Sequence, residues 1–292
     1  MTRARKRFRE ILFGSVCVPA ASIFDPLSAR IAHMLGWEVC KLSGSVAKAA
    51  DLAVPDGVPM ANISDMVDIC RRITRVADVS LIVDADDGGG GALNVLRTVQ
   101  ELEAAGVSAI EIEDNQVPPR IQGASSRHAL LVPKEEHVGK LKAAVAARRD
   151  ADTVIVARTS ALHQLPLDEA LDRIRDYSRT GVEAIMLPGL PPRGLADIVA
   201  LHQASDLPLC LLGLPLEATK DEAFLAANNV RIRFLGLGTY KVAVKAIHDT
   251  LKHLKNGGSP ADLRDREASE ELLQAVTRIP ELVEWERTYV VQ

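Results

Sequence analysis

Short apolar runs alternate along the chain with segments whose apolar residues recur at helical spacing. Short runs rich in β-branched residues and bounded by turn residues are typical of buried strands, and a recurrence near 3.6 residues is typical of helices. The pattern predicts strands at residues 15–19, 38–42, 80–84, 109–113, 153–157, 184–187, 207–211 and 231–237. It predicts helices at residues 26–35, 63–76, 92–105, 133–148, 167–179, 192–203, 220–228 and 240–255.

This alternation of strands and helices favours an α/β protein with a parallel sheet. Eight strands close a (β/α)8 barrel, a fold of about 250 residues, and the chain has 292. An open doubly wound sheet is the alternative, but no GxGxxG pattern follows the first predicted strand. We therefore predict one (β/α)8 TIM barrel domain over residues 1–292. An N-terminal helix would precede it at 1–14, and a helical tail would follow at 258–292.

Composition narrows the class of protein. Apolar residues make up 47% of the chain and charged residues 25%, as in an ordinary globular protein. A net charge of −4 and 3% aromatic residues argue against nucleic-acid binding, and the apolar runs are too short to span a membrane. The four cysteines form no CxxC pair, which favours reduced thiols in a cytoplasmic protein. The basic start could be a targeting peptide, but the spacing of Phe8, Ile11 and Leu12 favours a helix.

The run 81–91, LIVDADDGGGG, places two carboxylates at the end of the third predicted strand. Asp84 and Asp86 lie two residues apart, so on an extended backbone both would point to the same side. Paired carboxylates repel each other unless a cation lies between them, and Mg²⁺ prefers oxygen ligands of this kind. The alternative is a hydrophilic turn, in which Asp and Gly are common. The run predicts either a metal site or a turn.

Other predicted strands carry polar residues at the same rim, where barrel enzymes hold their chemistry. Glu111 and Glu113 share one face of the fourth strand, so the pattern leaves open which would face a metal. Arg158 follows the fifth strand, where its guanidinium could bind a carboxylate or phosphate, or form a structural bridge to Glu113 or Asp84. Ser43-Gly44-Ser45 has the composition of a tight turn whose N–H groups could hold a substrate oxygen.

Together these residues resemble the isocitrate lyase/phosphoenolpyruvate mutase superfamily, and within it the bacterial oxaloacetate decarboxylases most closely. The resemblance covers nearly the whole chain. The segments that carry it are Phe24-Asp25-Pro26-Leu27-Ser28-Ala29-Arg30, Ser43-Gly44-Ser45-Val46-Ala47, Pro55-Asp56, Asp84-Ala85-Asp86, Ala92-Leu93-Asn94-Val95, Arg97-Thr98-Val99-Gln100-Glu101-Leu102-Glu103, Ile112-Glu113-Asp114 and Ala157-Arg158-Thr159.

The resemblance implies a lyase that depends on Mg²⁺, with Mn²⁺ as an alternative, and acts on an α-keto acid. The implied reaction is decarboxylation of oxaloacetate to pyruvate and CO₂ through an enolate. The implied site residues are, for the metal, Asp84, Asp86 and Glu113; for catalysis, Arg158 and Asp56; and for substrate binding, Ser43, Gly44, Ser45 and Arg158. The resemblance also implies a homodimer or homotetramer in which neighbouring barrels exchange their last helices.

Three departures from the family pattern concern the substrate end of the site. Gly236 is followed by Leu237, where the decarboxylases have histidine, and Gly89 stands where they have an aromatic residue. The segment 118–128 has no cysteine, so the catalytic thiol of a methylisocitrate-type lyase is missing. A carbon–carbon lyase or phosphonate-type enzyme with another substrate is therefore an alternative, as is a catalytically weak homologue that binds a keto acid. The proton donor stays open among His163, Tyr240 and a metal-bound water.

Overall fold

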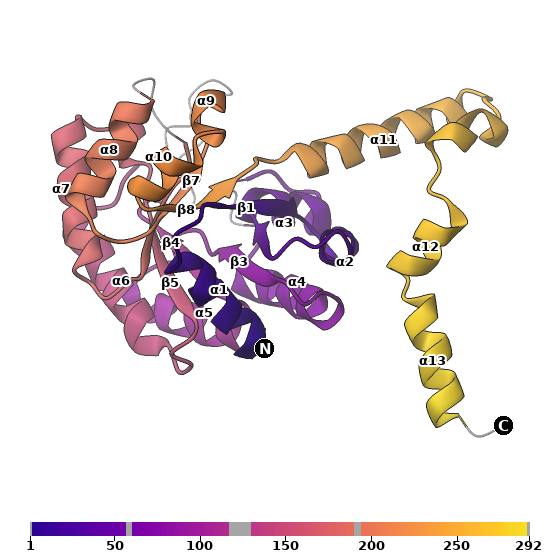
Figure 1. The fold of residues 1–292 in the computed structure, drawn as a ribbon, viewed down its shortest axis with the longest axis horizontal. Helices are drawn as coiled ribbons and strands as arrows, with labels where there is room; N and C mark the ends of the chain where they lie inside the picture. Colours follow the sequence, from indigo (N-terminus) through magenta and orange to yellow (C-terminus); the bar gives the residue numbers. More distant parts are fainter. Residues whose placement is uncertain (1, 57–59, 117–129, 190–193, 291–292) are drawn as a thin grey trace.

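The computed structural model describes residues 2–56, 60–116, 130–189 and 194–290. Within these residues, eight parallel strands close into a barrel: each strand pairs with the next along the chain, and β8 pairs with β1 (Figure 1). The strands are β1 Val18–Ile23, β2 Val39–Leu42, β3 Ser80–Asp84, β4 Ala109–Glu113, β5 Val154–Arg158, β6 Ala184–Leu187, β7 Leu209–Leu212 and β8 Val230–Phe234. The predicted (β/α)8 fold is confirmed.

Helices surround the barrel and extend beyond it (Figure 1). They are α1 Thr2–Leu12, α2 Pro26–Met34, α3 Gly44–Leu52, α4 Ile63–Val76, α5 Ala92–Ala104, α6 Lys134–Ala147, α7 Leu167–Ser178, α8 Leu195–Ala204, α9 Leu216–Thr219, α10 Glu222–Ala227, α11 Gly238–Lys255, α12 Glu270–Val276 and α13 Ile279–Tyr289, with 3₁₀ turns η1 Ala161–His163 and η2 Pro260–Arg266. Helix α3 was not predicted, because it begins Gly-Ser and is built from small residues. β1 was predicted at 15–19, but pairing continues past Pro19 to Ile23.

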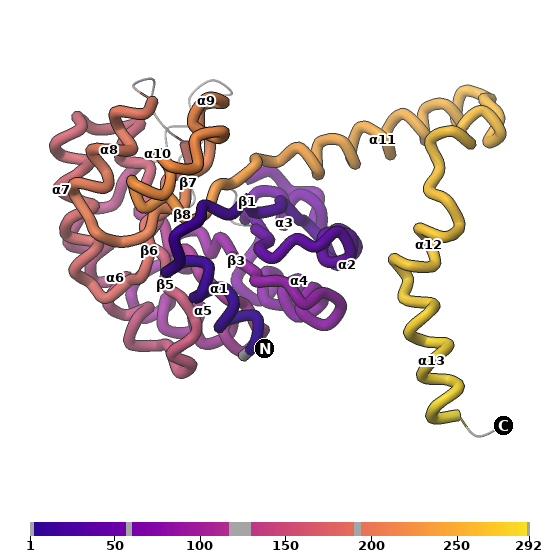
Figure 2. Tube along the Cα trace, viewed as in Figure 1, coloured from indigo at the N-terminus to yellow at the C-terminus, as the bar shows by residue number. Residues whose placement is uncertain are grey.

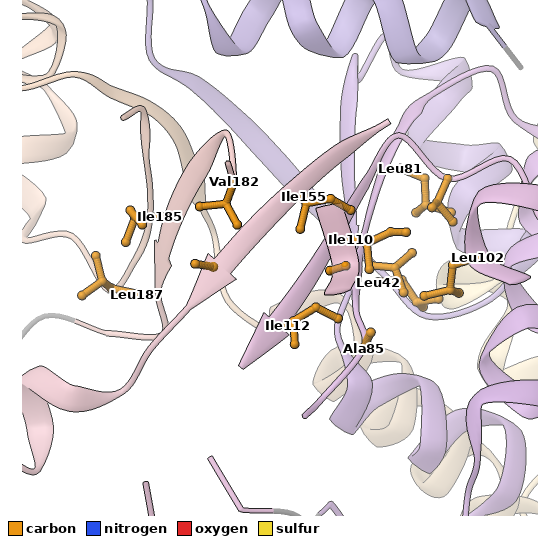
Figure 3. Close-up of a cluster of buried hydrophobic side chains, with 14 of the residues drawn as sticks. Leu42, Leu81, Ala85, Leu102, Ile110, Ile112, Ile155, Val182, Ile185 and Leu187 are labelled. Atoms are coloured by element: carbon orange, nitrogen blue, oxygen red, sulfur yellow. The ribbon is translucent and has the colours of Figure 1, made fainter. Parts of the chain in front are cut away.

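Two apolar layers hold the barrel together, because strand side chains alternate between its two faces. The outward-facing layer packs against the helices, and Figure 3 shows members of it from several strands, such as Leu81, Ile110 and Ile155. The inward-facing layer is smaller, and it includes Ile82 of β3 and Val156 of β5. Side chains therefore fill the barrel interior, and ligands must bind at a rim.

Helix α1 closes one end of the barrel. Phe8 and Leu12 of α1 are fully buried and belong to the inward-facing apolar layer. Arg5 donates from Nε to the carbonyl of Val107, which precedes β4, at 2.9 Å, and its Nη1 lies 2.5 Å from Oδ2 of Asp150, which precedes β5. These contacts lie at the amino ends of the strands, so the carboxyl ends form the open rim.

The C-terminal helices extend away from the barrel (Figures 1 and 2). Among the described residues, α11 has no buried side chain, and Val242, Ile247 and Leu251 are 60 to 70% exposed. Arg30 of α2 forms an ion pair with Glu281 of α13 at 2.6 Å, and this contact links the C-terminal helices to the barrel. Of the helices described, none is long and apolar enough to cross a membrane.

Candidate active site

Arg158, the last residue of β5, bridges two neighbouring strand ends at the open rim. Its Nη1 forms an ion pair with Asp84 of β3, and its Nη2 lies 3.0 Å from Oε2 of Glu113 of β4. Asp84 and Glu113 are 4% and 7% exposed. The register places Glu113 directly beside Arg158. Three residues singled out in the sequence therefore meet at one point, in the arrangement of the structural bridge considered above.

The N-terminus of α3 lies against the same carboxylate. The backbone N–H of Gly44 donates to Oδ2 of Asp84 at 3.3 Å, and Ser43 and Ser45 approach each other with their hydroxyls 3.2 Å apart. A helix N-terminus favours a negative charge. The prediction of a tight turn at Ser43-Gly44-Ser45 was wrong, because Gly44 is the first residue of a helix.

The carboxylate of Asp86 pairs with Lys48, whereas that of Asp84 pairs with Arg158. The backbone of Asp86 has φ +50°, in the left-handed region, because the chain leaves β3 after Asp84 and turns toward the glycine run. The expectation of an extended backbone through Asp86 was therefore wrong, although the carboxylates of Asp84 and Asp86 still border one space beside Gly44. Oδ2 of Asp86 lies 2.5 Å from Nζ of Lys48 in α3, and this lysine is also 3.5 Å from Oδ1 of Asp56.

The carboxylates at the rim differ in their proton affinity. Burial raises the pKa of Asp84, but the charges of Arg158 and Lys41 outweigh it and hold that pKa well below its usual range. Burial, together with the charge of Asp84, raises the pKa of Asp86 to about 6, although Lys48 acts against this. Burial raises the pKa of Glu113 to about 8 against the opposing charge of Arg158. Asp84 is therefore the carboxylate that stays ionised most firmly.

Oxygen atoms of Asp84 and Asp86 converge beside Gly44. A Cβ atom placed on Gly44 would lie 2.8 Å from Oδ1 of Asp86 and 3.5 Å from Oδ2 of Asp84, so the missing side chain leaves a space that both oxygens border. Among the described residues, no group of three or more His, Cys, Asp and Glu side chains is arranged as a metal site. The donors are nevertheless all oxygen, as hard divalent cations prefer, so the residue set fits such an ion.

A second ion pair lies deeper in the barrel, and the sequence analysis did not identify it as part of the site. Nζ of Lys41 in β2 pairs with Oε2 of Glu111 in β4, and that oxygen is 3.9 Å from Nη1 of Arg158. Glu111 is fully buried, and burial raises its pKa. The sequence contained a signal for this pair, because Lys41 lies inside a short apolar run and a buried charge needs a partner.

Asp114 faces outward from the barrel, as its position next to Glu113 predicts. Its Oδ2 accepts hydrogen bonds from the hydroxyls of Thr159 at 2.7 Å and Tyr177 at 2.8 Å, and it lies 3.4 Å from Nη1 of Arg173. Its backbone N–H donates to the carbonyl of Arg158 at 3.2 Å. This network fixes the ends of β4 and β5, and therefore the backbone that carries Glu113 and Arg158.

Comparison with known proteins decides the family. Residues 8–255 match the family described as phosphoenolpyruvate phosphomutase. The chain belongs to this family. It is 41% identical over 289 residues to an oxaloacetate decarboxylase of Paraburkholderia xenovorans (strain LB400), an alignment that covers 99% of this chain and 94% of that protein. The predicted membership of the isocitrate lyase/phosphoenolpyruvate mutase superfamily is confirmed.

Solved structures of related enzymes share the fold over the whole chain. A phosphonopyruvate hydrolase in complex with oxalate and Mg²⁺ has a TM-score of 0.80 and 28% identity and covers 99% of each chain. An oxaloacetate acetylhydrolase in complex with the inhibitor 3,3-difluorooxalacetate has a TM-score of 0.85 and 26% identity, covering 100% of this chain and 98% of the other.

Among the described residues, Asp84 borders two cavities. The cavity at the barrel mouth is about 60 Å³ and is bordered by Lys41, Arg158 and Leu237. A larger cavity of about 350 Å³ is bordered by Lys48, Asp86, Gly89 and Gly90. Two of the three departures noted in the sequence, Leu237 and Gly89, therefore lie on cavities next to the carboxylates.

The two candidate proton donors of the chain lie in different surroundings. His163 is exposed, and its Nε2 lies 3.1 Å from the carbonyl oxygen of Gly189. Tyr240, near the start of α11, packs edge-on against Phe24 with ring centroids 5.4 Å apart. The segment 118–128, where lyases of the methylisocitrate type carry a cysteine, lies outside the described residues. The choice of donor stays a prediction.

Proposed function

We propose that this chain catalyses the Mg²⁺-dependent decarboxylation of oxaloacetate to pyruvate and CO₂. The observation that carries the proposal is the bridge from Arg158 to Asp84 and Glu113 at the open rim. The identity of 41% with an oxaloacetate decarboxylase over 99% of the chain supports the choice of substrate. The oxalate and Mg²⁺ bound to a structural relative support the choice of cofactor.

Asp84, Asp86 and Glu113 would hold the Mg²⁺, or Mn²⁺ in its place. Asp84 is the principal ligand in this proposal, because its carboxylate remains ionised and because it borders both cavities. Asp86 and Glu113 complete the oxygen set from the β3 turn and from β4. When bound, the ion supplies Lewis-acid polarisation of the keto group.

The protein's own groups bind the substrate and stabilise its negative charge. Nε of Arg158 is buried without a hydrogen-bond partner among the described residues, so this N–H can donate to a substrate oxygen. The N-terminus of α3, with Ser43 and Ser45, presents dipoles and hydroxyls to a substrate carboxylate. Asp56, half-exposed and 3.5 Å from Lys48, lies in the connection between α3 and α4 and would close over the bound substrate.

The reaction breaks the bond between the keto acid's methylene carbon and its distal carboxylate. The electron pair of that bond passes toward the keto oxygen and gives the enolate of pyruvate, while the carboxylate departs as CO₂. Arg158 stabilises the developing negative charge because it is fixed in place before the reaction begins. Transfer of a proton to the carbon then completes pyruvate, from a donor that is open among His163, Tyr240 and water.

A carbon–carbon lyase or phosphonate-type activity on another substrate is the second candidate. One observation favours it: Leu237 borders the barrel-mouth cavity, where the resemblance predicts a histidine. Leucine has no polar hydrogen to donate. A homologue that binds a keto acid with little turnover is the third possibility, and it shares the same anion site.

We further propose that the chain forms a homodimer or homotetramer by exchanging its C-terminal helices. Helix α11 carries Val242, Ile247 and Leu251, all at least 60% exposed. The tail α12–α13 adds exposed apolar residues, including Leu282 and Trp285. Many exposed apolar residues on one set of helices are typical of a protein interface.

The test is pyruvate formation from oxaloacetate, measured with and without Mg²⁺ and compared with the rate of the metal alone. We expect turnover well above that background. Loss of activity in Asp84→Ala and Arg158→Met, with activity kept in the exposed control Arg179→Met, would support the assignment. No turnover across a panel of keto and hydroxy diacids, together with no Mg²⁺ affinity by calorimetry, would refute both enzyme candidates. Tight binding without turnover would identify the third.

A further inference from the structure

Lys41 lies at the floor of the barrel-mouth cavity. It belongs to β2, whose four residues are all buried, and the lysine itself is 7% exposed. It borders the same cavity as Asp84 and Arg158. Its Nζ pairs with Glu111 and lies 4.9 Å from the centre of the Phe234 ring. The ammonium is therefore held from two sides inside a cavity that a ligand can enter.

Lys41 and Arg158 flank one carboxylate. Both approach Oε2 of Glu111, Lys41 in an ion pair and Arg158 at 3.9 Å. Oε1 of Glu111 has no hydrogen-bond partner among the described residues. The carboxylate is thus shared between two cations and does not pair with Lys41 alone.

The cations of this group border the cavity. Lys41 and Arg158 pair with the carboxylates of Asp84, Glu111 and Glu113. Of these groups, Asp84, Lys41 and Arg158 line the cavity. Lys41 and Arg158 are therefore the positive charges that an anion in the cavity would approach.

The cavity also has apolar lining residues. Met186 of β6, Leu212 of β7 and Leu237 after β8 contribute to it, whereas the charged residues come from β2, β3 and β5. A substrate anion would place its charge-bearing oxygens toward Lys41 and Arg158, and its departing group toward these apolar residues. The cavity therefore orients an asymmetric anion.

We propose that Lys41 is a substrate-binding residue that, with Arg158, stabilises the negative charge of the enolate formed in the reaction. The part of this proposal that concerns the enolate rests on the proposed function. The part that concerns anion binding rests on the cavity alone. The chemical class of ligand is a planar dianion such as oxalate, which resembles the enolate of pyruvate in shape and charge.

The test measures oxalate binding by calorimetry in the presence of Mg²⁺, alongside kcat and KM for oxaloacetate. The informative variant is the double change Lys41→Met with Glu111→Gln, because it removes both charges of the buried pair and leaves no unpaired carboxylate. We expect oxalate affinity and kcat each to fall about 100-fold, as for loss of one stabilising donor, with a much smaller change in KM. Lys41→Arg, which keeps the charge, should retain more oxalate affinity than Lys41→Met.

The outcomes separate this inference from the proposed function. If the double variant melts at the parent temperature and binds oxalate within about twofold of the parent, a difference under 1 kcal/mol, Lys41 has a structural role and the inference is overturned. If the parent forms no pyruvate but needs Lys41 to bind oxalate, the decarboxylase function fails and the anion site stands. If Lys41→Arg loses as much affinity as Lys41→Met, a requirement for positive charge is refuted.

Discussion

Nζ of Lys48 lies 2.5 Å from Oδ2 of Asp86, so a carboxylate proposed to hold Mg²⁺ already has a cation from the protein beside it. Lys48 is 7% exposed and also approaches Asp56. The lysine favours the ionised form of Asp86, against burial and the charge of Asp84, which together raise the pKa of Asp86 to about 6. The ion pair therefore helps to set the pH range in which Asp86 can bind a metal.

Lys48→Met should move the pH dependence of Mg²⁺ binding upward. Without the ammonium, Asp86 keeps its proton to a higher pH, and loss of a nearby opposite charge shifts a carboxyl pKa by about 1–3 units. Because the protonated carboxyl is a poor ligand, Mg²⁺ affinity should begin to rise at a higher pH than in the parent. Calorimetric titrations between pH 5 and pH 8 measure this. Lys142→Met, an exposed lysine on α6, is the control; equal midpoints in the parent and Lys48→Met would contradict the prediction.

Mg²⁺ binding at pH 7 should release protons. Burial raises the pKa of Glu113 to about 8, so at pH 7 this carboxyl holds its proton in much of the metal-free protein. A cation nearby favours the ionised form and expels that proton. Calorimetry in buffers of different ionisation enthalpy counts the protons released.

Glu113→Gln should reduce that count, because the amide has no proton to lose in this range. Glu217→Gln, on the exposed face of α9, should leave it at the parent value. The same count in Glu113→Gln as in the parent would assign the released protons to another group.

Leu237→His should raise the rate of oxaloacetate decarboxylation. Leu237 borders the cavity that contains Arg158, and a histidine there adds a donor near neutral pH. General acid–base groups contribute up to several orders of magnitude, and we expect roughly a tenfold gain in kcat, since the surrounding wall is apolar. Steady-state kinetics give the comparison, with Leu216→His, 71% exposed on α9, as control. A loss of activity in Leu237→His alone would favour the second candidate function, in which the leucine fits another substrate.

Ile247→Glu should dissociate the oligomer. Ile247 is 60% exposed on α11 in the single chain, and burying a new carboxylate in an interface is costly unless it is paired. Light scattering after size exclusion should show a lower mass than the parent. Lys252→Glu changes charge on the same helix among exposed residues and should leave the mass unchanged. Equal masses for all three proteins would place the interface elsewhere.

Much of the fold could be predicted from the sequence, because buried parallel strands are short apolar runs with sharp limits. The runs at β3, β4 and β6 predict the observed bounds. Helix α3 could not be found by the same reasoning, because it is short and begins Gly-Ser, and its first residue contacts the carboxylate of Asp84. The spacing of apolar residues along the sequence does not reveal this tertiary contact.

The site was predictable where it depends on strand ends, and less so where it depends on turns. Asp84, Glu113 and Arg158 each occupy a strand end, and the rule that these ends share one rim brings them together. The orientation of Asp86 depends on its positive φ, which spacing along the sequence does not reveal. Lys41 and Glu111 show that the reasoning applied to Arg158 should extend to every charge within a buried strand.

The contacts of α1 have a consequence for how damaged preparations of this protein would behave. Arg5, Phe8 and Leu12 secure the closed end of the barrel, far along the strands from Asp84 and Arg158. Proteolytic loss of this helix would therefore lower the fraction of molecules that are folded, while the molecules that remain folded keep their rim intact. Such a sample would show a reduced specific activity with an unchanged KM, and titration of active sites would distinguish it from a catalytic defect.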